Sequence, residues 1–406
     1  MRIFIAGIDG YLGWSLALYL GARGHEVAGA DLYLRREWVS EVGGQSATPI
    51  LSMADRQKVF QEKFKKEMRF FEGDLQDYSF VRDCLSSFKP DAIVHLGENP
   101  SAPYSMIDLD HCVFTHKNNM IGTLNIVYAL KEICPHAHLL KLGTMGEYGT
   151  PNVVIPEGFF EIEYRGRKDT LPFPRQANSW YHQTKVHDTN NIMMACRLWG
   201  LRSTDIMQGV VYGTRIDEMG DDERMLTRLD FDECFGTAIN RFCCQAVIGH
   251  PLTLYGQGHQ KRGFLPLRDS MQCLSLALEN PPDEGEYRVF NQFEEVYDLT
   301  ELAHKVQKIG NALGLNVEIQ NLDNPRKENE DHFYQADHKH LLDLGYKPTS
   351  DMDVELKTML SDLIRYKNRI EEKVDSLVPN IRWDGSRQKS ECISGGNSSS
   401  RVEALK

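Results

Sequence analysis

The sequence lacks an apolar run long enough to cross a membrane, so we expect no membrane span. It also lacks an excess of positive charge, because its 406 residues carry a formal net charge of −12, which disfavours binding to nucleic acid or to an anionic membrane. Its nine cysteines do not have the spacing of metal ligands, so we expect reduced thiols and no metal site. Because a strand pattern already begins at Arg2, we expect no signal or transit peptide before it and a cytoplasmic location.

The amino terminus has the pattern of a strand, a glycine-rich turn and a helix. Residues 2–6 form a short apolar run, and an apolar-periodic segment extends from residue 14 to residue 20. Between them, Gly7 allows a tight turn, Gly10 lets the backbone approach a pyrophosphate, and Gly13 packs the helix on the strand. The amino end of such a helix faces an anion. We expect a dinucleotide to contact Gly7, Asp9, Gly10, Tyr11, Leu12 and Gly13.

The next strand predicts which dinucleotide binds. It spans residues 26–31 and ends in Asp31, where a carboxylate would accept hydrogen bonds from the ribose hydroxyls of the cofactor. This position favours NAD over NADP. Arg35 and Arg36 follow closely, and either arginine could instead bind a 2′-phosphate.

Strand and helix patterns alternate along the chain, which predicts an α/β fold with a doubly wound parallel sheet of the Rossmann type. We expect further strands at residues 68–71, 92–96, 138–142 and 202–206. We expect helices at residues 54–64, 235–248, 299–313 and 351–371. The predicted organisation is a cofactor-binding and catalytic domain at 1–207, a smaller mixed α/β substrate-binding region at 208–384, and a flexible tail at 385–406.

Tyr181 and Lys185 lie four residues apart in a helical segment, so both side chains point to one face. A lysine cation about 6 Å from a phenol favours the phenolate by roughly 2.8 kcal/mol, or about two pKa units, at an effective dielectric of about 20. The pair therefore predicts a base with Tyr181 as the proton acceptor. The alternative is an ordinary amphipathic helix that carries both residues by chance.

Two strand ends bring further polar residues to the expected ligand-binding edge of the sheet. Thr144 and Glu147 follow the strand at 138–142, and Glu98 follows the strand at 92–96. Because open α/β sheets bind ligands at the carboxyl ends of their strands, we expect these residues to line a pocket. The alternatives are that Thr144 only caps the turn and that Glu98 is a solvated carboxylate.

These motifs together resemble the extended short-chain dehydrogenase/reductase superfamily, whose members act on nucleotide-sugars. The resemblance rests on the glycine turn, Asp74-Leu75, Asn119-x-x-Gly122-Thr123, Thr144 and Tyr181-x-x-x-Lys185. Longer runs are similar to one family within it, the UDP-sulfoquinovose synthases, over roughly residues 1–347. The runs are Ser101-Ala-Pro-Tyr-Ser-Met-Ile-Asp108, Leu142-Gly-Thr-Met-Gly-Glu-Tyr-Gly-Thr-Pro151, Lys185-Val-His-Asp188, Gln208-Gly-Val-Val-Tyr-Gly213 and Phe235-Gly-Thr-Ala-Ile-Asn-Arg-Phe242.

The resemblance implies a homodimeric enzyme that binds NAD⁺, UDP-glucose and sulfite. By it, Tyr181 removes the proton of the sugar 4-hydroxyl, Lys185 lowers the pKa of Tyr181, and Thr144 assists. The 4-ketone acidifies C5, water leaves from C6, and a sulfur nucleophile adds at C6. This chemistry needs a second acid/base, for which His182, Glu147 and Glu98 are the candidates.

The resemblance also implies a set of ligand contacts. Besides the turn, Asp31, Arg35 and Arg36, the expected cofactor contacts are Asp74, Leu75, Leu96, Gly97, Glu98, Asn118, Asn119, Tyr181, Lys185, Gln208 and Val211. The expected substrate contacts are Ser101, Tyr104, Thr144, Met145, Gly146, Glu147, Tyr181, Gln208, Arg241, Thr253, Arg262, Arg326 and His332. Arg262 and Arg326 fit a diphosphate because arginine binds such anions through two parallel hydrogen bonds.

Two residues depart from the pattern of the synthases. Pro100 stands where the synthases have an arginine, and Pro266 stands where they have an acidic residue. Loss of a cation beside the reactive end of the sugar would weaken attraction for sulfite. The alternatives are delivery of sulfur by a partner protein, or a UDP-hexose dehydratase or epimerase that uses no sulfite or adds another nucleophile. A sensing protein that binds nucleotide-sugars without catalysis is a third possibility, which the intact Thr144, Tyr181 and Lys185 disfavour.

Overall fold

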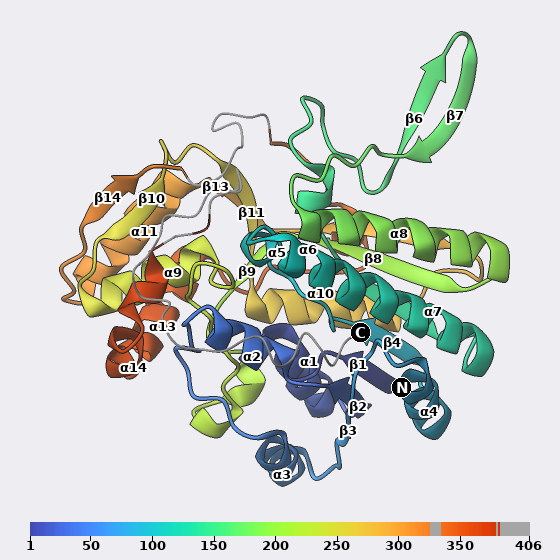
Figure 1. Cartoon of the computed structure of the whole chain (residues 1–406), viewed down its shortest axis with the longest axis horizontal. Coiled ribbons are helices and arrows are strands. Elements are labelled where there is room, and N and C mark those ends of the chain that lie inside the picture. The colour runs from blue at the N-terminus through green and yellow to red at the C-terminus, as the bar shows by residue number, and fades with distance from the viewer. Residues whose placement is uncertain (325–333, 379–380, 382–406) are drawn as a thin grey trace.

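The computed structural model describes residues 1–324, 334–378 and 381. Its central layer is a seven-stranded sheet with the strand order β3-β2-β1-β4-β5-β8-β12, in which every neighbouring pair is parallel (Figure 1). The strands are β1 Arg2–Ala6, β2 Glu26–Asp31, β3 Arg69–Glu72, β4 Ala92–His95, β5 His138–Thr144, β8 Arg202–Gln208 and β12 Tyr287–Gln292. This arrangement confirms the predicted doubly wound fold.

Helices cover both faces of the sheet, which is why the central strands are apolar on both sides. One face is covered by α1 Tyr11–Ala22, α3 Met53–Phe64 and α10 Leu267–Glu279, with Trp14, Phe60 and Leu274 in one hydrophobic core. The other face is covered by α4 Tyr78–Phe88, α7 Gly122–Ile133 and α8 Trp180–Trp199, with Leu85, Val127 and Ile192 in a second core. The strand order reverses between β1 and β4, and such a switch point opens a crevice for ligands at the carboxyl ends of the strands.

A third core lies in the region after β8. Helices α9 Ala238–Ile248, α11 Leu299–Ala312 and α13 Met352–Ile364 pack together there through Phe242, Leu302 and Leu356. They accompany two small sheets, which are formed by β9 Val210–Tyr212, β11 Lys261–Pro266 and β13 Glu295–Asp298, and by β10 Leu252–Tyr255 and β14 Ile319–Leu322. In Figure 1 this region lies beside the carboxyl edge of the central sheet. Residues of α9 and β11 line a cavity together with the ends of β4, β5 and β8.

The shorter elements lie mostly in the connections. The helices are α2 Leu34–Glu41, α5 Ala102–Ser105, α6 Leu109–His116, α12 His340–Asp343 and α14 Lys367–Glu371, and a π-helical turn spans Lys117–Ile121. The 3₁₀ turns are Met145–Tyr148, Asp217–Met219, Glu223–Met225 and Val374–Leu377.

Three features differ from the sequence predictions. The helix predicted for 351–371 is two helices, α13 and α14, because Tyr366 N–H bonds back to Leu363 O and ends the first helix. The helix predicted from residue 235 begins at Ala238, where the Thr237 side chain caps it. A projecting hairpin, β6 Phe159–Tyr164 and β7 Arg167–Pro172, was not predicted (Figure 1).

The division at residue 207 stays a prediction. Helix α10 and strand β12 lie beyond that residue in the chain and nevertheless belong to the central layers of the first region. The predicted tail at 385–406 lies outside the described residues.

Candidate active site

A cavity of about 540 Å³ lies at the carboxyl edge of the sheet. Its walls include the glycine turn after β1, the ends of β4, β5 and β8, and residues of α9 and β11 from the second region. The expected cofactor residues and the expected substrate residues therefore meet in one continuous space.

The glycine turn has the geometry that a pyrophosphate needs. Gly7 has φ +88°, and a Cβ at that position would lie 2.7 Å from Gly97 N, so only glycine fits. A Cβ on Gly13 would lie 2.1 Å from Gly7 O, which explains the close packing of α1 on the turn. Gly10 precedes α1 at the N-cap position and supplies no side-chain cap, so the amino end of the helix stays open to an anion. The turn therefore fits a dinucleotide.

Asp31 ends β2 beside this turn and lines the cavity. Its carboxylate accepts hydrogen bonds from Asp9 N at 2.9 Å and Tyr33 N at 2.8 Å. Burial, together with the nearby Asp9 carboxylate, raises the pKa of Asp31 to about 6. Hydroxyl donors from a ribose would stabilise the ionised carboxylate, which is the role expected for Asp31 with NAD.

The two arginines considered for a 2′-phosphate are already engaged with acids. Arg36 binds the Asp9 carboxylate through Nε at 2.7 Å and Nη2 at 2.6 Å, and it does not line the cavity. Arg35 does line the cavity, but its Nε binds Asp230 at 2.8 Å. Because Arg36 is paired with Asp9 away from the cavity and Asp31 occupies the ribose position, the site favours NAD over NADP.

Lys185 lies behind the cavity wall and is paired with a buried acid. Its Nζ donates to Leu142 O at 2.7 Å and forms an ion pair with Glu98, whose side chain is 2% exposed. The other oxygen of Glu98, Oε1, lies 3.2 Å from His95 Nε2. Burial by itself would raise the pKa of Glu98, but Lys185 and His95 hold it below its usual value. Glu98 is therefore an anion in this structure.

Tyr181 lines the cavity, but the predicted lowering of its pKa is wrong for this structure. Burial raises the pKa of Tyr181 well above its ordinary value, and the carboxylates of Glu98 and Glu147 raise it further. Burial is the larger cause, and the Glu98 carboxylate that pairs with Lys185 adds to it. Without ligands, Tyr181 is a neutral phenol.

Thr144 and His182 lie at the cavity with Tyr181. The Thr144 hydroxyl accepts a hydrogen bond from Gly146 N at 3.2 Å, so it caps the turn as well as facing the cavity. The His182 ring contacts the Tyr181 ring at 4.8 Å between centroids, and its Nδ1 lies 2.8 Å from Ser179 Oγ. A Cβ on Gly146 would lie 2.3 Å from His182 Nε2, so glycine leaves the space that the imidazole occupies.

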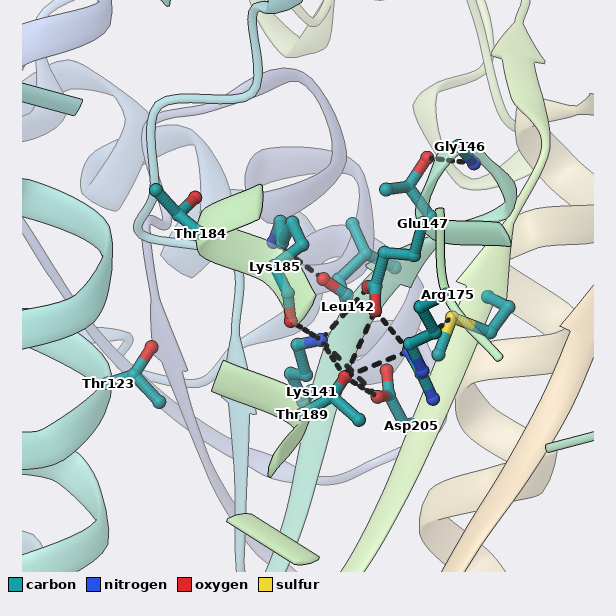
Figure 2. Close-up of polar contacts among 12 residues, drawn as sticks. Thr123, Lys141, Leu142, Gly146, Glu147, Arg175, Thr184, Lys185, Thr189 and Asp205 are labelled. Carbon is teal, nitrogen blue, oxygen red and sulfur yellow. Dashed lines mark hydrogen bonds and ion pairs between the residues drawn. The ribbon is translucent and has the colours of Figure 1, made fainter. Parts of the chain in front are cut away.

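Glu147 was predicted as a catalytic and substrate-binding residue, but it does not line the cavity. Its carboxylate is fully buried, and it pairs with Lys141 Nζ at 3.2 Å and with Arg175 (Figure 2). The 3₁₀ turn Met145–Tyr148 directs this side chain inward, away from the crevice. Both oxygens of Glu147 are used by cations, so it has no exposed acid group to offer a sugar.

The buried network around Glu147 was missed by sequence reasoning. Figure 2 shows Lys141 Nζ at its centre, with Thr189 Oγ1 at 2.7 Å and Asp205 Oδ2 at 3.3 Å. Lys141 Nζ also donates to the backbone oxygen of Lys185 at 3.1 Å, so the network anchors helix α8, which carries Tyr181 and Lys185. A lysine inside the apolar strand β5 was the sequence signal, since a buried charge needs partners.

Other predicted residues divide into those that line the cavity and those that do not. The remaining residues that line it are Asp9, Tyr11, Leu12, Asp74, Leu75, Leu96, Gly97, Glu98, Asn118, Ser101, Met145, Gly146, Gln208, Val211, Arg241 and Arg262. Tyr104 and Thr253 do not line the cavity. The Tyr104 hydroxyl donates to Glu41, and Thr253 Oγ1 accepts from Gln245. Asn119 is buried and accepts from Asn99 N. Arg326 and His332 lie outside the described residues.

Comparison with known proteins agrees with this geometry. The model of the NAD dependent epimerase/dehydratase family matches residues 3–291. The chain is 48% identical over 382 residues to the chloroplastic UDP-sulfoquinovose synthase of Spinacia oleracea, covering 94% of this chain and 79% of that protein. It is also 48% identical over 384 residues to the UDP-sulfoquinovose synthase of Sulfolobus acidocaldarius, covering 94% and 98%.

The chain belongs to the NAD dependent epimerase/dehydratase family, on the branch of the UDP-sulfoquinovose synthases. Its fold matches the UDP-glucose 4-epimerase of Thermotoga maritima with UDP-glucose, with a TM-score of 0.67 and 18% identity over 91% of this chain and 99% of that one. A UDP-glucuronic acid 4-epimerase of Bacillus cereus matches with the same TM-score. The predictions of an enzyme of this family and of NAD as its cofactor are confirmed.

A membrane span and a metal site were both expected to be absent, and the structure bears on them only within the described residues. In the described residues, no helix is long and apolar enough to span a membrane. No group of His, Cys, Asp and Glu side chains there could hold a metal ion.

Proposed function

We propose that this enzyme converts UDP-glucose and sulfite to UDP-sulfoquinovose. The reaction oxidises the sugar at C4, removes water across C5 and C6, adds sulfite at C6 and reduces C4 again. The observation that supports it most is the meeting of Thr144, Tyr181 and His182 at one cavity with the glycine turn. The 48% identity to two UDP-sulfoquinovose synthases over almost the whole chain supports the choice of reaction.

The glycine turn and Asp31 are the residues proposed to hold the cofactor. NAD, when bound, supplies the acceptor and donor of a hydride at C4. The positive charge of its oxidised ring also adds a cation near Tyr181, which favours the phenolate. Since Lys185 is neutralised by Glu98, this contribution is needed before Tyr181 can accept the proton of the 4-hydroxyl.

His182 is proposed as the second acid/base. Its ring lies against Tyr181 and lines the cavity, and an imidazole has an unperturbed pKa near neutrality. Of the other two candidates, Glu147 is buried between Lys141 and Arg175, and Glu98 is paired with Lys185. His182 is thus the candidate whose ring lies at the cavity beside Tyr181.

Arg241 and Arg262 are proposed to bind the UDP diphosphate. Both line the cavity, on the side of the second region. Arg241 is 3% exposed and donates to Tyr255 and Thr253, and its Nε has no hydrogen-bond partner among the described residues. The family-derived roles of Arg326 and His332 remain predictions, because both residues lie outside the described ranges.

Sulfite as the sulfur donor depends on the surroundings of Pro100. This proline lines the cavity where the synthase pattern has an arginine, and it supplies no charge for a doubly negative anion. We propose that free sulfite is used weakly unless a sulfur-delivering protein or another cation compensates. A dehydratase or epimerase that does not add sulfite is the alternative that the same substitution favours.

A homodimer and a cytoplasmic location complete the proposal. Helices α6, α7 and α8 lie side by side in Figure 1, and they carry several exposed large apolar side chains. These are Leu109 (74% exposed), Val113, Tyr128, Trp180, Met194 and Leu198 (63% exposed). Such a patch supports pairing with a second copy of the chain. The spinach relative is named as chloroplastic, so the cytoplasmic location remains a prediction from the sequence.

Mass spectrometry of the products from UDP-glucose, with and without sulfite, tests the reaction. UDP-sulfoquinovose should form only when sulfite is present, and Pro100→Arg should lower the sulfite concentration required. An unsaturated or epimerised UDP-hexose in both samples, with no sulfonate, would select the dehydratase or epimerase. Absence of any product and of any NADH signal would select a binding protein without catalysis.

A further inference from the structure

Two arginines share one buried carboxylate at the cavity wall. Arg35 Nε lies 2.8 Å from Asp230 Oδ2, and Arg228 contacts the same carboxylate through Nε at 3.0 Å and Nη2 at 2.9 Å. The side chains of Arg228 and Asp230 are 2% and 3% exposed. Burial alone would raise the pKa of Asp230, but Arg228 and Arg35 hold it below its usual value. The three side chains therefore carry one more positive than negative charge.

Each of the two arginines has an unused donor. Both side chains line the cavity. Within the described ranges, the Nη1 of neither Arg35 nor Arg228 has a hydrogen-bond partner, although both atoms are buried. A buried guanidinium N–H without an acceptor destabilises the protein, and an oxygen of a ligand that accepted this hydrogen bond would remove the penalty. The pair thus places a net positive charge and two unpaired N–H donors at the cavity wall.

The segment that carries Arg228 lies against the phosphate-binding turn. Thr227 Oγ1 donates to the backbone oxygen of Tyr11, the first residue of α1, at 2.8 Å. Three residues further along α1, Trp14 Nε1 donates to Met225 O at 2.8 Å. The positive pair is therefore held close to the open amino end of α1, where a pyrophosphate is expected.

Neighbouring acids do not cancel this charge by contact. The Asp9 carboxylate is bound by Arg36 and by Arg56 Nη1 at 2.9 Å. Asp232 lies two residues after Asp230 and uses Oδ1 to accept from two backbone N–H groups. Burial, and then the Asp230 charge, raises the pKa of Asp232 to about 6.

We propose that Arg35 and Arg228, joined by Asp230, form an oxyanion clamp that acts with the glycine turn to hold the pyrophosphate of the bound dinucleotide. Retention of the cofactor then depends on Arg228, which lies beyond the first 207 residues of the chain. Free sulfite also presents anionic oxygens and is the other ligand that the clamp could hold. The cofactor part of the proposal does not depend on sulfonation of a sugar.

Replacement of Arg228 by methionine tests the clamp, because methionine keeps an unbranched side chain and removes the charge. We expect purified Arg228→Met to retain much less NAD(H) after gel filtration than the parent. On protein stripped of NAD(H), its affinity for ADP-ribose should fall about 10- to 100-fold, whereas its affinity for adenosine should be unchanged. Arg224→Met is the matched control, since Arg224 lies four residues earlier and its side chain is 54% exposed, and it should retain NAD(H) like the parent.

Arg35→Met provides a second variant on a different element, in case Arg228→Met does not fold. It should show the same selective loss of ADP-ribose over adenosine, and Arg228→Lys should recover part of the loss. A normal NAD(H) content with a several-fold higher KM for sulfite would show that the clamp holds the free oxyanion instead. Unchanged values for ADP-ribose and sulfite in both methionine variants would overturn the proposal, as would an equal loss of adenosine and ADP-ribose.

Discussion

The ammonium of Lys185 is paired with the buried carboxylate of Glu98, which follows strand β4 at the cavity wall. In this position Glu98 neutralises the cation that was expected to acidify Tyr181. Burial and the Glu98 charge both raise the pKa of Tyr181. Tyr181 is therefore a protonated phenol in the ligand-free structure.

Removal of the Glu98 charge should change the pH dependence of catalysis. Glu98→Gln takes an anion away from the phenolate, so the pKa of Tyr181 should fall and the pH profile of NAD reduction by UDP-glucose should move to lower pH, by about one unit. Rapid-mixing absorbance at 340 nm between pH 5 and 10 measures it. Asp188→Asn is the control, because burial followed by the Glu98 charge raises the pKa of Asp188 and its replacement removes little charge. An unshifted profile in Glu98→Gln would remove this role from Glu98.

The buried network around Glu147, which has Lys141 at its centre, should contribute strongly to the free energy of unfolding. Lys141→Met leaves Glu147 and Asp205 buried without their shared cation, so the free energy of unfolding should fall by about 3–5 kcal/mol. Urea unfolding followed by circular dichroism measures the change. Lys168→Met, at a lysine whose side chain is 81% exposed in the β6–β7 hairpin, should change the value by less than about 0.5 kcal/mol. Equal effects of the two replacements would contradict the importance given to the network.

NAD binding should weaken in acid because of Asp31. Its pKa of about 6 in the ligand-free protein means that the carboxylate gains a proton as the pH falls through 6, and the ribose hydroxyls prefer the ionised form. Lowering the pH from 7 to 5 should therefore raise the Kd for NAD about tenfold. Asp31→Asn should bind NAD more weakly at pH 7 but lose most of this pH dependence, as measured by calorimetry. The effect of Asp31 on folding has the opposite pH dependence. Because the pKa is raised in the folded state, the free energy of unfolding of the ligand-free protein should fall as the pH rises from about 4 to 6.

The apolar patch on α6, α7 and α8 should hold two copies of the chain together. Leu198→Glu places a charge in the patch, and sedimentation velocity should then show a monomer where the parent is a dimer. Val154→Glu is the control, because Val154 is 43% exposed and lies outside these three helices. A parent that sediments as a monomer would contradict the proposed pairing.

Local patterns were sufficient to predict the parts of the site that depend on neighbouring residues in the chain. The glycine turn, Asp31 at the end of β2 and Thr144 at the end of β5 lie at the cavity as their positions in strand and turn indicated. Glu147 follows Thr144 by three residues, but the 3₁₀ turn directs it onto Lys141, and no periodicity in the sequence encodes that rotation.

Contacts between distant segments could not be derived from the sequence. Glu98 and Lys185 are 87 positions apart, and the pair forms only because β4 and α8 pack on the same crevice. Arg35 lies in α2, and it shares Asp230 with Arg228 only because the fold brings α2 to the segment that carries residues 228–230. The β6–β7 hairpin was missed although Arg165 and Gly166, both with positive φ, form a turn typical of hairpins.

Formation of NADH in a single turnover tests the central claim that Tyr181 starts a redox reaction on a UDP-hexose at this cavity. After UDP-glucose is mixed with the NAD-loaded parent enzyme, absorbance at 340 nm should rise and then decay. Tyr181→Phe should keep its NAD and its affinity for UDP-glucose, because one hydroxyl is removed with little change in ring volume, but it should give no absorbance change. The same rise in Tyr181→Phe as in the parent would contradict the account.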